Sequence, residues 1–188
     1  MRVTKGITVL GLAFVIAWPV LAQEGKKEEL KYLGSGGCKA CHTTKKSGAA
    51  YKVWQKTKHA QAYAALASEE AKAIAKERGI ADPQKSEECL SCHVTAFGVE
   101  ASRLGPKYKI EEGVSCEACH GPGSKYKSNK VMKGITAGTI DPASVGLIKM
   151  KEEDCKRCHN KKSPNFKGFD FEKMFAQIAH KTPEKTSK

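Results

Sequence analysis

The apolar residues of the chain gather near its two ends, with an alanine-rich stretch between them. Residues 6–22 form an apolar run behind the basic residues Arg2 and Lys5, which is the pattern of a secretory signal peptide. Small residues around Ala22 predict cleavage after that position. The alternative is an uncleaved anchor helix, because the run is close to the shortest apolar length that spans a membrane. Either way, the folded part is expected outside the cytoplasm, in the periplasm.

Two further segments have helical patterns. Residues 49–78 are rich in alanine and charged residues and lack proline and glycine, so they are predicted to form one long helix. A second helix is predicted over residues 169–180. Its apolar stripe consists of Phe171, Met174, Phe175 and Ile178. The stretch 124–146 is predicted to be loop-rich, and the expected fold class is mainly α with little or no sheet.

The expected organisation is a single domain with short extensions. Residues 1–22 are the signal peptide, 23–36 a charged linker, 37–181 the domain and 182–188 a basic disordered tail. Aromatic residues make up only 7% of the chain, and its apolar residues form no long periodic runs. A conventional protein core is therefore expected to be thin.

All eight cysteines fall in four copies of one pattern, Cys-x-x-Cys-His. We number these motifs in chain order: motif 1 is Cys38–His42, motif 2 Cys89–His93, motif 3 Cys116–His120 and motif 4 Cys155–His159. This spacing is the c-type haem attachment signal. The two thiols form thioethers with one porphyrin, and the adjacent histidine can bind its iron.

Each motif is therefore predicted to carry one haem c, and four haems with helices and loops around them would supply the missing core. The predicted haem-binding residues are Cys38, Cys41, Cys89, Cys92, Cys116, Cys119, Cys155 and Cys158. The predicted iron ligands within the motifs are His42, His93, His120 and His159. Zinc ribbons, thioredoxin-type sites and disulfides also use paired cysteines. None of these alternatives explains a histidine after every second cysteine.

The number of histidines limits axial ligation. Besides the four in the motifs, the chain has only His59 and His180, so at most two haems can be bis-histidine within one chain. His59 shares a predicted helix face with Tyr63 and Leu66. His180 lies opposite the apolar stripe of its predicted helix, so it can bind iron only if that helix is sandwiched or ends earlier.

Methionine is the other common axial ligand of haem iron. Met132 is the candidate here, because it lies in a polar stretch with no apolar stripe to join. The alternative is that Met132 only packs against a haem edge. Lys130 and Lys133 are further candidate ligands.

The charge of the chain suggests the nature of its partners. The whole chain has 33 basic and 20 acidic residues; removal of residues 1–22 leaves 31 basic residues and a net charge of +11. The propionates of four haems would offset roughly four of these charges. A positive surface suits a redox partner with an acidic docking face or an anionic membrane surface. Nucleic acid binding fits poorly with export and haem attachment.

The residues around the motifs resemble the tetrahaem cytochrome c-554 family. The resemblance rests on Trp54–Ala60, Cys92–Gly98 and Gly113–Gly123, and it extends from about Gly37 to His180. The best-known members accept electrons from hydroxylamine oxidoreductase in ammonia-oxidising bacteria. The resemblance implies a mostly helical fold with closely stacked haem pairs.

The resemblance also implies particular ligands. His59 would be the distal ligand of the haem on motif 3, His180 that of the haem on motif 4, and the haem on His93 would have an open distal side. The family's histidine after the Gly-Pro-Gly segment is missing from residues 124–134. The haem on His42 would then take Met132, stay open or borrow a ligand from another chain.

The function predicted from the sequence is electron transfer between redox proteins rather than enzymatic catalysis. Haem potentials are tuned by ligand, burial and hydrogen bonding, and the chain has no evident acid–base machinery. Two alternatives remain. A haem with an open side could reduce nitric oxide, nitrite or peroxide, or the chain could self-associate into a multihaem assembly in which a neighbour donates a ligand.

Overall fold

The computed structural model describes residues 29–180. The predicted signal peptide, most of the predicted linker and the predicted basic tail lie outside the described residues. In the described part, no helix has both the length and the apolar character needed to cross a membrane.

The described part of the chain is mainly helical, which confirms the predicted fold class. The α-helices are α1 (Gly36–His42), α2 (Ala50–Gln55), α3 (Ala62–Ala65), α4 (Glu69–Glu77), α5 (Glu87–His93), α6 (Cys116–His120), α7 (Asn129–Thr136), α8 (Glu152–Lys156) and α9 (Phe171–Ile178). The 3-10 helices are η1 (Lys45–Ser47), η2 (His59–Gln61), η3 (Ala101–Arg103), η4 (Ile110–Glu112) and η5 (Ala143–Val145). An isolated bridge between Tyr32 and Leu104 is the only β-type pairing among residues 29–180.

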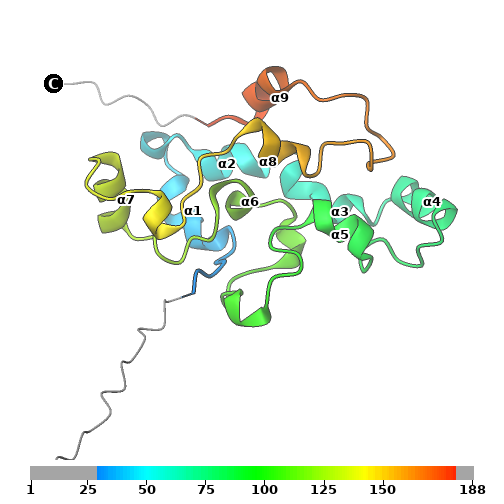
Figure 1. Ribbon diagram of the computed structural model, residues 1–188, viewed down its shortest axis with the longest axis horizontal. Helices are drawn as coiled ribbons and strands as arrows, with labels where there is room; N and C mark the ends of the chain where they lie inside the picture. Colours follow the sequence, from blue (N-terminus) through cyan, green and yellow to red (C-terminus); the bar gives the residue numbers. More distant parts are fainter. Residues whose placement is uncertain (1–28, 181–188) are drawn as a thin grey trace, which may run out of the picture.

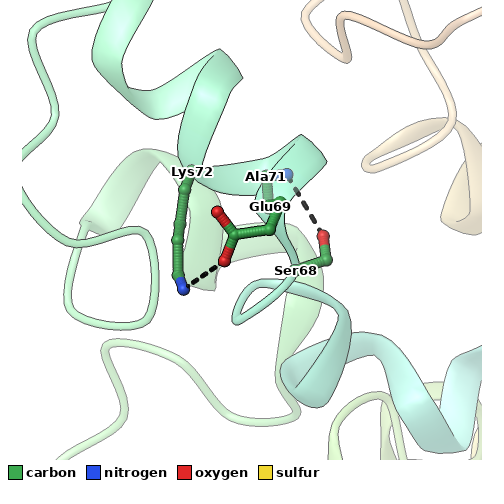
Figure 2. A network of polar contacts seen from close by, with 4 residues as sticks. All are labelled: Ser68, Glu69, Ala71 and Lys72. Carbon is green, nitrogen blue, oxygen red and sulfur yellow. Dashed lines mark hydrogen bonds and ion pairs between the residues drawn. The ribbon is translucent and has the colours of Figure 1, made fainter.

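The predicted single helix over residues 49–78 is wrong, because the chain there forms α2, η2, α3 and α4. Ser68 is extended and caps α4, its hydroxyl accepting a hydrogen bond from the Ala71 N–H at 3.1 Å. Figure 2 shows this cap beside the ion pair of Lys72 with Glu69. A serine at this position offers the backbone an alternative to a continuous helix. Alanine content alone did not reveal the break.

Two other predicted segments also differ from the structure. Residues 129–136 of the expected loop form α7, which begins at the cap made by Ser128 with the Val131 N–H. The C-terminal helix is shorter than predicted, because Asp170 caps its start and Ala179 is already extended. Met132 therefore lies in a helix rather than in a loop.

The protein core is thin, as expected from the composition. Within residues 29–180 the buried hydrophobic side chains are Leu66, Ala75, Leu90, Val94 and Tyr126. Leu66, Leu90 and Val94 form one cluster that joins the end of α3 to α5. Such a small cluster cannot by itself stabilise a domain of this length, so the motif regions must contribute packing of their own.

Buried carboxylates fasten the N-terminal segment to the rest of the molecule. The Glu117 side chain, only 2% exposed, accepts hydrogen bonds from the N–H groups of Leu33, Gly34 and Gly123 at 2.7–2.8 Å. Glu112 accepts another from the Ser35 N–H at 2.7 Å. Because the contacts to residues 33–35 span about 80 residues of sequence, they set the position of α1 against α6.

Candidate haem-attachment sites

Each Cys-x-x-Cys-His motif sits on a short helix. Motifs 1, 2 and 3 end α1, α5 and α6, respectively. In motif 4, α8 ends at Lys156, but the His159 N–H still bonds the Cys155 carbonyl oxygen at 3.0 Å. Helical geometry puts residues three and four apart on the same face. Both thiols and the histidine of every motif therefore project toward one side, as attachment of one flat macrocycle requires.

The four motifs lie close to one another in a definite order. A hydrogen bond between the side chains of Cys38 and Cys116 raises the pKa of Cys116 and lowers that of Cys38. Motifs 1 and 3 are thus neighbours through their thiols. All eight cysteines are free, as haem attachment requires.

Two further pairs of neighbouring thiols complete the series. Burial, followed by the nearby Cys155 thiol, raises the pKa of Cys119 to about 11. Burial, followed by the neighbouring Cys92 thiol, raises the pKa of Cys158 to about 12. The motifs therefore neighbour one another in the order 1–3–4–2, and Figure 1 shows α1, α6, α8 and α5 in this order along the long axis.

The two histidines outside the motifs each face a motif histidine. The ring centroids of His59 and His159 are 5.9 Å apart, with an angle of 76° between the ring planes. Those of His120 and His180 are 5.8 Å apart, at 58°. Metal–nitrogen bonds of about 2 Å on either side of an ion put two facing ring centres roughly 6 Å apart. Both pairs have the separation that one iron between them needs.

These pairs differ from those that the resemblance implies. The His59 ring faces the histidine of motif 4, and the His180 ring faces that of motif 3. The haem that each would ligate stays a prediction. Burial lowers the pKa of His59 and of His120, which favours the neutral imidazole that binds metal ions. A backbone contact with Val114 positions His59, and the early end of α9 positions His180.

His59 is placed by the segment that precedes motif 3. Its carbonyl oxygen accepts a hydrogen bond from the Val114 N–H at 3.0 Å, and the Trp54 indole N–H donates to the Val114 carbonyl at 2.9 Å. Gly113 has a φ of +63°, and a Cβ there would lie 2.8 Å from the His59 carbonyl oxygen. Only glycine permits both this conformation and this approach.

His180 lies beyond the end of α9, so helical geometry does not direct its side chain away from the apolar face of that helix. Helix α9 stops at Ile178, and Ala179 has φ −62° and ψ 135°. The early end of this helix, or its enclosure on both sides, was the condition for His180 to serve as a ligand, and the early end is present. His180 also influences His42, whose pKa is lowered by burial and then by His180.

The remaining motif histidines are oriented by their surroundings. The Nδ1 atom of His93 lies 2.7 Å from the carbonyl oxygen of Ala62. A ring nitrogen engaged in this way leaves the other nitrogen free for a metal. The ring of His159 stacks on that of Phe169, with centroids 5.0 Å apart and an angle of 20°. Free paired thiols, facing imidazoles and an oriented His93 together fit haem c.

Some residues that position the motifs were not found by sequence reasoning, and the predicted haem-binding residues and iron ligands stay predictions. Glu117 lies inside motif 3 and Glu112 just before it, yet neither was singled out, because a carboxylate in a polar segment usually faces solvent. For Gly113, the sequence offered only one signal of its role beside His59, namely that a glycine stands shortly before motif 3. Met132 is half-buried in α7, and its role as a ligand remains a prediction.

The mainly helical fold and the repeated motifs define a c-type cytochrome, and comparisons with known proteins agree. The family described as "Cytochrome c554 and c-prime" matches residues 37–121. A curated relative is cytochrome c-554 of Nitrosomonas europaea, 27% identical over 197 aligned residues that cover 98% of this chain and 79% of the relative. No solved structure matched the chain. The chain is thus similar to the cytochrome c554 family over residues 37–121 and to this relative over most of its length. As a c-type cytochrome, it binds haem c covalently and transfers electrons.

Proposed function

We propose that the protein is a periplasmic tetrahaem cytochrome that carries electrons between redox proteins. The observation that carries this proposal is the order of the four motifs along the molecule, 1–3–4–2, with the thiols of successive motifs near one another. Each haem, when bound, accepts and donates a single electron. A series of neighbouring sites lets the point of entry be separated from the point of exit along the molecule.

The histidine contacts support a ligand set for two of the four sites. We assign His59 and His159 to one iron, and His120 and His180 to another. The chain has six histidines, and these two pairs use four of them. His42 and His93 each bind the haem of their own motif, so no histidine of the chain is left as a second ligand for either. Histidine pairs favour a low-spin iron that exchanges electrons without exchanging ligands, which suits a carrier.

The number of haems is tested by quantifying covalently bound haem in the exported protein. We expect four haems per chain in the wild type, and three when Cys89 and Cys92 are both replaced by serine. An exported wild-type protein with fewer than four haems, or with stoichiometric zinc instead, would contradict the tetrahaem proposal. The serine variant is the matched control for incomplete maturation.

The ligand assignment of His59 has its own test. His59→Ala is expected to open one additional haem to carbon monoxide after reduction, because the distal imidazole is lost. A variant without the motif 4 haem is made by replacing Cys155 and Cys158 with serine. In that background His59→Ala should open no further haem. An additional carbon monoxide site there would assign His59 to motif 3 instead.

A second candidate function is reduction of a small molecule such as nitric oxide, nitrite or peroxide. The observation that favours it is the lack of a histidine partner for His42 and His93. High-spin ferric haem in the wild type, with turnover of one of these substrates, would support it. Purely low-spin spectra in a monomeric protein would exclude it, whereas low-spin spectra lost on dilution would favour ligand donation between subunits.

A further inference from the structure

The charges of the chain are distributed unevenly. Residues 30–68 and 118–140 contain no aspartate or glutamate at all. Their lysines are Lys31, Lys39, Lys45, Lys46, Lys52, Lys56, Lys58, Lys125, Lys127, Lys130 and Lys133. The acidic residues lie elsewhere, so a modest net charge per residue conceals one strongly basic region.

Three helices of these two segments lie toward one end of the molecule. They are α1, α2 and α7, which Figure 1 places toward the same end of the long axis, whereas α4 lies at the opposite end. We call the lysines on and between α1, α2 and α7 the basic end. The helices at the opposite end, α4 and α5, both begin with pairs of glutamates.

Three lysines of the basic end stand out by their exposure. Lys45, Lys46 and Lys52 are exposed and have no ion-pair partner among residues 29–180. By contrast, Lys72, Lys85 and Lys156 elsewhere in the chain pair with nearby carboxylates. Unneutralised like charges on one surface repel one another. Such a cluster therefore gains from a surface of opposite charge.

Motif 1 lies within this basic end. Cys41 is exposed, whereas the other seven cysteines are half-buried. Lys39, inside the same motif, lies with its Nζ 5.6 Å from the ring centroid of Tyr51 on α2, which ties the motif surface to the neighbouring lysines. Motif 1 is also a terminus of the 1–3–4–2 series. The motif with the exposed cysteine thus lies among exposed lysines.

We propose that an acidic electron-transfer protein docks on the basic end and exchanges electrons at motif 1. This inference rests on the proposed function and adds the docking face and the charge of the partner. Charge complementarity acts mainly on the encounter rate, which rises by about 10 to 1,000-fold when oppositely charged surfaces meet. The terminal position of motif 1 leaves motif 2, at the other end of the series, for a second partner.

The experiment uses the haem-loaded full chain and reduced cytochrome b5 as an acidic protein probe. The test variant is Lys45→Gln with Lys46→Gln and Lys52→Gln. The matched control is Lys161→Gln with Lys162→Gln and Lys167→Gln, which removes the same charge from exposed lysines near motif 4. Stopped-flow absorbance gives the second-order rate constant at several salt concentrations, and titration calorimetry with oxidised cytochrome b5 gives the Kd.

At low salt, the test variant should react about tenfold more slowly than the wild type and bind correspondingly more weakly, while the control changes less than about threefold. The rates should converge at high salt, where charges are screened. Equal losses in both variants, or rates independent of salt, would overturn the docking face. If the wild type exchanged electrons with no redox probe at all, the proposed function itself would fail.

Anionic membranes are the competing occupant of a lysine-rich face. Sedimentation with phosphatidylglycerol vesicles separates the two. Negligible vesicle binding by the wild type at physiological salt supports the protein partner. Tight vesicle binding that depends on Lys45, Lys46 and Lys52, with cytochrome b5 kinetics unaffected by their replacement, would overturn the proposal in favour of a membrane.

Discussion

Replacement of Glu117 by glutamine should destabilise the protein strongly, although the two side chains have almost the same size. The carboxylate is 2% exposed and accepts four hydrogen-bond contacts from three backbone N–H groups. One oxygen accepts from Leu33 and Gly123, and the other from Leu33 and Gly34. An amide presents an NH₂ group in place of one oxygen. Whichever way the amide turns, the N–H of Gly34 or of Gly123 would then face a donor, and the Leu33 N–H would lose one of its two acceptors.

The size of this effect follows from the hydrogen bonds lost. A buried polar group left without its partner costs about 1–3 kcal/mol. The two contacts affected by the amide, together with the weaker bonds to the neutral oxygen that remains, suggest a loss of about 3 kcal/mol. For a domain of this size, about 2–4 °C is lost for each kcal/mol. The expected fall in Tm is therefore on the order of 10 °C.

The assay is thermal unfolding of the haem-loaded variants, followed by circular dichroism at constant salt and with haem content verified. Glu111→Gln is the control, because Glu111 is exposed in the same acidic pair as Glu112. It should change the Tm by no more than about 2 °C, as surface substitutions generally do. Similar Tm values for Glu117→Gln and Glu111→Gln would refute the reasoning. Limited proteolysis should also show earlier cleavage near Leu33 in the Glu117 variant.

Two other substitutions test local features. Gly113→Ala forces a Cβ to within 2.8 Å of the His59 carbonyl oxygen at a φ of +63°. The free energy of unfolding, measured by denaturant titration, should therefore fall by about 2 kcal/mol. An unchanged midpoint would count against the close approach. Ser68→Ala removes the cap of α4 and should cost about 1 kcal/mol. A Ser68→Asp variant should restore that stability in the same titration, and an unstable Ser68→Asp variant would contradict the capping role.

The sequence alone determined the chemistry of the attachment sites. A thiol pair and a histidine within five residues form a site through local geometry and covalent bonds, so motifs 1–4 are recognisable without knowledge of the remaining fold. The helical class and the thin core were also predictable from composition and periodicity. In the same way, the number of histidines limits axial ligation whatever the arrangement of the helices.

Only the tertiary structure decided how these local units are assembled. The position of His59 depends on the hydrogen bond from the Val114 N–H to its carbonyl oxygen. The placement of motif 1 depends on Glu117, which lies more than 80 residues away from the segment it holds. Neither contact leaves a periodic pattern in the sequence, because each joins only one or a few residues in two distant segments. The apparent continuity of residues 49–78 was broken for the same reason. The local cap at Ser68 and the hydrogen bond between His59 and the distant Val114 outweighed the high helix propensity of alanine.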